Sequence, residues 1–72
     1  MSADAAPSDR VRTLLLRGDN VLKSAKPERF GRALAAFEEA REVAADASVD
    51  DRVRALVERR IETLRQLMEA QA

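Results

Sequence analysis

Residues 32–44, RALAAFEEAREVA, form a helical pattern with two apolar sides. At 100° per residue the apolar positions separate into two groups, which are Ala33, Leu34 and Phe37 on one side and Ala36, Ala40 and Val43 on another. A helix that covers a core from one side needs a single apolar stripe. We therefore expect this helix to lie between two other helices, and its small Ala side chains to let both neighbours come close.

The remaining ordered segments are also predicted to be helices, because apolar residues recur at intervals of three and four and β-branched residues are few. The helices are expected at about residues 8–24, 27–45 and 49–70, with connections of a few residues. The stripe of the first helix is Val11, Leu14, Leu15, Gly18, Val21 and Leu22. The stripe of the third is Val53, Leu56, Val57, Ile61, Leu64, Leu67 and Met68. The chain is thus predicted to be an all-α antiparallel three-helix bundle over residues 8–70, after a disordered lead-in over residues 1–7.

Local signals predict how these helices begin and where two of them touch. Ser8 is the expected N-cap of the first helix, Pro27 the expected first position of the second, and Ser48 with Asp51 matches a capping box for the third. Gly18 lies within the first apolar stripe. A missing side chain there predicts close approach of a neighbouring helix, although an isolated Gly can also be only a weak point in a helix.

The chain of 72 residues has a formal net charge of zero, but its charges are unevenly distributed. Residues 1–32 carry +3, residues 33–51 carry −5 and residues 52–72 carry +2. Folding is therefore expected to bring opposite charges of different helices together. A domain this small is marginal without well-packed helices or a partner, so self-association is one expectation.

Composition argues against most kinds of chemistry. The chain has no His, Cys, Tyr or Trp, and hence lacks the common general base, the thiol nucleophile and the usual transition-metal ligands. Glu38 and Glu42 share a helix face and could form a cation site, but a solvated acidic face is the simpler interpretation. We expect a non-enzymatic protein with no cofactor and no metal site. With no long apolar run and no signal-peptide pattern at its start, the chain is expected to be cytoplasmic and not to bind a membrane.

Nucleic-acid binding is an alternative, because a small helical domain with five Arg in its last third resembles a helix-turn-helix protein in composition. Glu58, Glu62 and Glu69 interrupt those arginines, so no one-signed stripe faces a phosphate backbone. The connection between the second and third helices is also longer than the tight turn of that motif. DNA binding is therefore the less favoured alternative.

A family resemblance covers about half the chain. Gly18, followed by Ala33-x-x-x-Phe37-x-x-Ala40, resembles the helix-contact residues of a tetratricopeptide repeat. The spacing from Gly to Ala is longer than in that repeat, and Arg17, Val21 and Ala45 depart from its pattern. A single repeat cannot bury its own face, so the resemblance implies that the third helix acts as a cover. A helical hairpin with one covering helix is similar to the microtubule-interacting and transport domain, which implies binding of a helical or extended segment in an interhelical groove.

The residues expected to bind a partner are Leu16, Arg17, Arg60, Leu64, Leu67 and Met68. The third helix is longer than the first, so its C-terminal end, with Leu64, Leu67 and Met68, is expected to overhang and leave an apolar groove. The alternative is that these three residues merely complete the core. Arg60 falls within the apolar stripe of its helix. Either its stem covers apolar surface while the guanidinium reaches solvent or an internal carboxylate such as Asp19, or the guanidinium lines the groove and binds a partner's carboxylate.

These features favour a small protein–protein interaction module. The expected partner is a protein or peptide, with an acidic amphipathic helix the segment that best suits Leu, Met and Arg together. The alternative is a self-associating structural or regulatory subunit, which forms a homo-oligomer.

Overall fold

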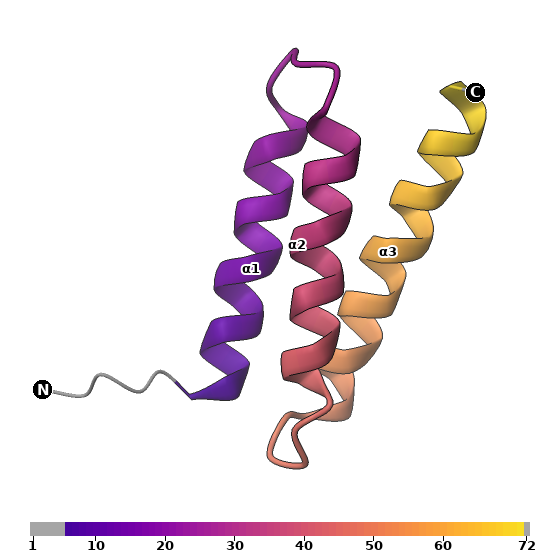
Figure 1. The fold of residues 1–72 in the computed structure, drawn as a ribbon. Coiled ribbons are helices and arrows are strands. Elements are labelled where there is room, and N and C mark those ends of the chain that lie inside the picture. The colour runs from indigo at the N-terminus through magenta and orange to yellow at the C-terminus, as the bar shows by residue number, and fades with distance from the viewer. Residues whose placement is uncertain (1–5, 72) are drawn as a thin grey trace, which may run out of the picture.

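The computed structural model describes residues 6–71, and these form three helices joined by short connections. They are α1 (Pro7–Leu22), α2 (Arg29–Ala44) and α3 (Asp51–Gln71), and successive helices run in opposite directions (Figure 1). The predicted all-α three-helix architecture is confirmed. Residues 1–5, which make up most of the expected lead-in, lie outside the described part, and Pro7 already belongs to α1.

α2 is the central helix, as its two apolar sides predicted. It packs closely along α1 and also contacts α3, whereas α1 and α3 touch each other little. Five of its residues are buried, namely Ala33, Ala36, Phe37, Ala40 and Ala44. Four of the five are Ala, so both neighbouring helices can approach the α2 backbone closely.

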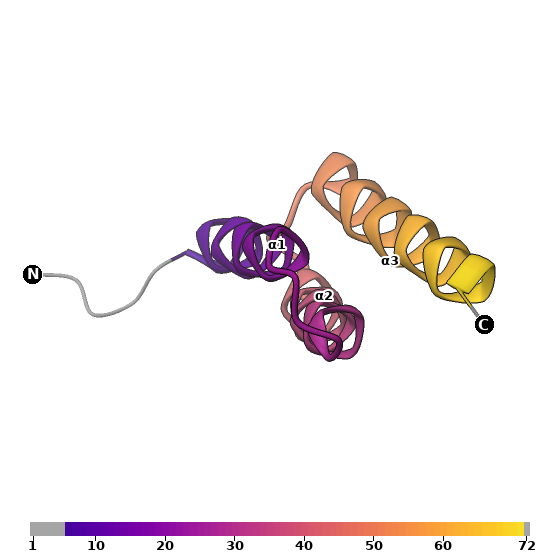
Figure 2. The same cartoon turned by 90° about the horizontal axis from the view of Figure 1, so that it is seen from above.

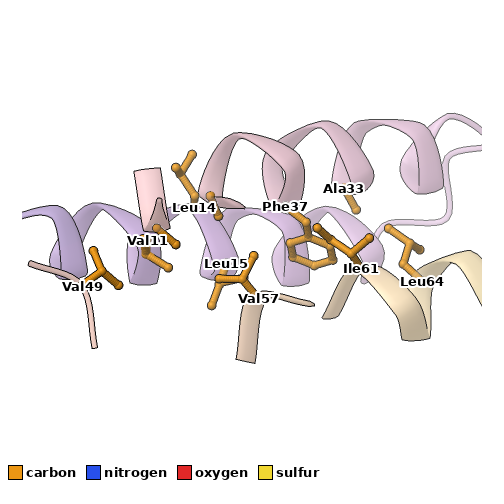
Figure 3. Packing of buried hydrophobic residues seen from close by; sticks show 11 residues of the cluster. Val11, Leu14, Leu15, Ala33, Phe37, Val49, Val57, Ile61 and Leu64 are labelled. Carbon is orange, nitrogen blue, oxygen red and sulfur yellow. The ribbon is translucent and has the colours of Figure 1, made fainter. Parts of the chain in front are cut away.

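The core is a single apolar cluster to which all three helices contribute. Its large members include Val11, Leu14 and Leu15 of α1, Phe37 of α2, and Val57, Ile61 and Leu64 of α3 (Figure 3). Val49, from the connection before α3, closes one end. Each apolar side chain moved out of water contributes about 1.5–3 kcal/mol to folding.

The helix starts differ from the sequence-based expectation. Ala6, not Ser8, precedes the first turn of α1, with Pro7 at the first helical position, where its missing N–H costs nothing. Pro27 lies in a turn, and α2 begins two residues later with Glu28 as N-cap. The proposed capping box is also wrong: the Ser48 hydroxyl donates to Asp46 Oδ1, and Asp50 Oδ1 instead accepts the Arg52 backbone N–H at the start of α3.

Arg54 joins the end of α2 to the start of α3. Its Nε donates to the Ala44 carbonyl oxygen at 2.7 Å and its Nη2 to the Asp46 carbonyl oxygen at 3.0 Å, while Nη1 pairs with the Asp51 carboxylate. The last carbonyls of a helix have no partners within the helix, and the guanidinium here satisfies that of Ala44.

Further along, ion pairs cross between α2 and α3. Arg41 binds Glu58 through two hydrogen bonds of 2.9 and 3.0 Å, and Arg65 lies 3.8 Å from Glu38. In these two pairs each helix supplies one acid and one base, in agreement with the predicted meeting of opposite charges of different helices. Exposed pairs of this kind add under about 1 kcal/mol each.

α3 diverges from the other two helices towards its C-terminus. Figure 1 shows its last turns well separated from α2, and Figure 2, from above, shows α3 running away from the α1–α2 pair. Because α3 rests mainly on α2, only a narrow line of its apolar residues is covered. Leu56, expected in the stripe, is therefore 41% exposed. Within residues 6–71, no helix is both long and apolar enough to cross a membrane.

Candidate functional site

A groove of about 250 Å³ lies where α3 separates from the hairpin of α1 and α2. The end of α1, the middle of α2 and the second half of α3 all contribute to it. Its lining residues are Asp19, Leu22, Phe37, Arg59, Arg60, Thr63, Leu64 and Leu67. We call this the α1–α3 groove.

The groove has an apolar floor and one exposed apolar wall. Phe37 and Leu64 are each only 1% exposed, and Figure 3 shows both in the core near Ile61. Leu22, at the end of α1, is half-buried against the same cluster. Leu67 is 45% exposed although it stands beside this floor. A large side chain left half in water next to a buried apolar surface would gain from a partner that covers both.

The polar side of the groove is an ion pair between α1 and α3. Arg60 donates to Asp19 from Nε at 3.1 Å and from Nη2 at 2.8 Å, so both carboxylate oxygens are used. Both side chains remain about one third exposed. Arg60 therefore pairs with Asp19, the carboxylate named as its expected internal partner, and its side chain also lines the groove.

The predicted partner-binding residues separate into two regions. Arg60, Leu64 and Leu67 line the α1–α3 groove, and Met68 packs, half-buried, against the core. Leu16 and Arg17 lie elsewhere, on α1, where they line a shallow hollow with Thr13, Asn20 and Val21. The structure thus does not bring Leu16 and Arg17 together with the other four.

The expected overhang of Leu64 is wrong. Leu64 is a core residue, because α3 still packs at this turn against the cluster that contains Phe37 of α2, and Leu67 on the next turn is exposed. Leu22, Phe37, Arg59 and Thr63 were not predicted as site residues. Leu22 and Phe37 looked like ordinary core residues in the sequence, and only the tilt of α3 shows that they face a groove.

The groove lining carries a small excess of positive charge. Arg59 and Arg60 stand against Asp19, which leaves one positive charge in excess among the lining residues. Across the part of the chain that the structure describes, no three acidic side chains come together as a metal site. Glu38, one of the two carboxylates considered for a cation, instead faces Arg65.

Comparison of the chain with protein-family models, with curated protein sequences and with solved structures gave no match. The three-helix architecture and the groove are therefore the basis for a functional assignment. None of these comparisons supports the resemblance to a tetratricopeptide-type hairpin or to the microtubule-interacting and transport domain.

Proposed function

We propose that the protein is a non-enzymatic interaction module of the cytoplasm that binds a helical or extended segment of a partner protein in the α1–α3 groove. The observation that carries this proposal is the position of Leu67, 45% exposed beside the fully buried Phe37 and Leu64. The groove of about 250 Å³ is smaller than the roughly 300–1,000 Å³ of small-molecule sites. It suits one or two side chains that anchor a longer segment lying along the surface.

The contact between Gly18 and Phe37 supports the family resemblance behind this proposal. The Phe37 ring fills the space left by the missing side chain of Gly18, which is the role that the A-x-x-x-F-x-x-A pattern implies for its aromatic residue. α3 then covers the hairpin on one side, as a third helix must. A hairpin with a covering helix and a groove between helices is also what the likeness to the microtubule-interacting and transport domain implies.

The test is a selection of displayed helical and extended peptides on the immobilised protein. Selected peptides are then measured against two variants, Leu67→Ser and Leu56→Ser. Both residues are half-exposed leucines of α3, so the two variants lose similar apolar surface. Only Leu67 lines the groove. We expect Leu67→Ser to lose peptide binding and Leu56→Ser to keep it. Equal binding by both variants would place the interaction elsewhere.

A second candidate function is self-association through the outer face of α1. Leu16 is 61% exposed, and Val21 lies beside it in a hollow that is mostly apolar. Sedimentation equilibrium of the wild type and of Leu16→Ser separates the two functions. A dimer that Leu16→Ser dissociates supports self-association, whereas a monomer at micromolar concentration supports the interaction module.

A further inference from the structure

We infer that the partner of the α1–α3 groove is an acidic amphipathic helix, one carboxylate of which binds the outer edge of the Arg60 guanidinium. This inference rests on the proposed function and specifies its partner. Asp19 accepts hydrogen bonds from only one edge of the Arg60 guanidinium.

Asp19 occupies one edge of the guanidinium. A guanidinium has five N–H donors in a planar fork, and Asp19 takes one from Nε and one from Nη2. The second edge, formed by Nη1 and the other N–H of Nη2, has no acceptor among residues 6–71. That edge matches the spacing of a carboxylate and can bind it through two parallel hydrogen bonds.

Asp19 also orients Arg60 before a partner arrives. Two hydrogen bonds from α1 hold the guanidinium plane, so less side-chain entropy is lost when the free edge is used. The cost of placing a second carboxylate near Asp19 is offset by Arg59, the next residue on α3, which also lines the groove. The site therefore holds two cations for two carboxylates, one of which the partner supplies.

The apolar part of the groove sets the second requirement on the partner. Arg60, Leu64 and Leu67 follow one another at i, i+4 and i+7 and so share one face of α3, with roughly 10 Å between the first and the last. A helix lying along α3 must therefore place its carboxylate and a large apolar side chain about two turns apart. The carboxylate gives orientation, and the apolar residue covers Leu67.

The inference is tested with two displayed peptide libraries of helical design. Both carry the same apolar positions, but the polar positions are Asp or Glu in one library and Asn or Gln in the other. We expect binders from the acidic library whose affinity falls when Leu67 is changed to Ser. In these peptides, amide replacement of one acid is expected to weaken binding about tenfold or more.

Arg60→Lys keeps the positive charge but removes the planar fork of N–H donors. It should lower the affinity for the same acidic peptides by about tenfold or more. Arg52→Lys, an exposed residue at the start of α3 outside the groove, is the matched control and should bind like the wild type. In a double-mutant cycle, replacing the peptide's acid by its amide should lower the affinity only slightly for the Arg60→Lys variant. The acid-to-amide change is made in the peptide and so cannot affect the fold of the protein. Circular dichroism establishes that the Arg60→Lys variant is folded.

Two other outcomes are distinguishable. If the amide library yields equally tight binders that need Leu67, or if Arg60→Lys binds the acidic peptides unchanged, the inference is overturned while the proposed function stands. If neither helical library yields a binder that depends on Leu67, the inference fails, and the proposed function fails with it when extended peptides give no such binder either.

Discussion

The ring of Phe37 lies against Gly18 more closely than any side chain at that position would allow. A Cβ built on Gly18 would stand 2.3 Å from Cε1 of Phe37 and 2.9 Å from Cζ. Real Cβ contacts of this length do not occur, so Gly18 permits the close approach of α1 and α2. The close-approach interpretation of Gly18 is therefore confirmed, and this contact also places Phe37 on the floor of the α1–α3 groove.

Gly18→Ala should destabilise the protein by about 1–3 kcal/mol, because the added Cβ would overlap the buried Phe37 ring and force the ring or the helices to shift. This loss occurs although Ala favours a helix over Gly by up to about 1 kcal/mol. The control is Gly31→Ala in α2, where an added Cβ meets no atom within 4 Å. That variant should be as stable as the wild type or more so. Urea unfolding measures both, and a stabilised Gly18→Ala would contradict the contact.

The central position of α2 leads to a second prediction. Ala40 is fully buried and Ala36 is 7% exposed, so Ala36→Arg or Ala40→Arg would force a charged side chain between helices and should unfold the domain. Glu39, next to Ala40 but exposed, should tolerate Arg with a change of about 0.5 kcal/mol or less. Thermal melting followed by circular dichroism measures all three. Similar melting temperatures would mean that α2 is not the middle helix.

The three helices and the middle place of α2 could be predicted because they depend on apolar periodicity, which a sequence displays directly. The Asp19–Arg60 pair was also foreseeable, since a charge inside an apolar stripe needs a partner. The helix starts were less predictable. Ser8, Pro27 and Ser48 each have the right residue type for a helix start, but several neighbouring residues compete for that role, and Asp50 replaces Ser48 before α3.

The groove could be predicted only in outline. The sequence grouped Leu64, Leu67 and Met68 as one open surface, whereas the structure buries the first, exposes the second and half-buries the third. Which turn of α3 leaves the core depends on its tilt, and tilt follows from how α3 packs on α2. Leu56 was expected in the core but is 41% exposed, because a periodic stripe does not show how wide a band of a helix its neighbours cover.

The Asp19–Arg60 pair should contribute modestly to stability. Both side chains are about one third exposed, so a double-mutant cycle of Asp19→Asn and Arg60→Gln should give a coupling energy of about 1 kcal/mol or less. High salt should reduce it further. In Arg60→Leu the apolar replacement should raise or preserve stability. If that variant also bound partner peptides unchanged, Arg60 would serve only to cover apolar surface.

Asp46 predicts a pH dependence in the connection between α2 and α3. The Ser48 backbone N–H, donating at 2.9 Å, lowers the pKa of Asp46 below its usual value, and the Ser48 hydroxyl adds to this effect. A carboxyl whose pKa is lower in the folded than in the unfolded state stabilises the fold above about pH 4, and this contribution disappears as the pH falls through the folded-state pKa. The wild type should therefore have a larger unfolding free energy than Asp46→Asn at neutral pH, and this difference should shrink as the pH is lowered through the folded-state pKa of Asp46. A difference independent of pH would exclude this linkage.

The separate roles of Leu67 and Met68 give the last prediction. Met68 is half-buried against the core, so Met68→Ser should lower stability by about 1–2 kcal/mol. Leu67→Ser should change stability by about 1 kcal/mol or less, because much of this side chain is already in water. The double variant should then melt like Met68→Ser alone, while partner binding should be lost in every variant that lacks Leu67. If Leu67→Ser melted far below Met68→Ser, Leu67 would be a core residue, and its exposure would no longer support a docking surface.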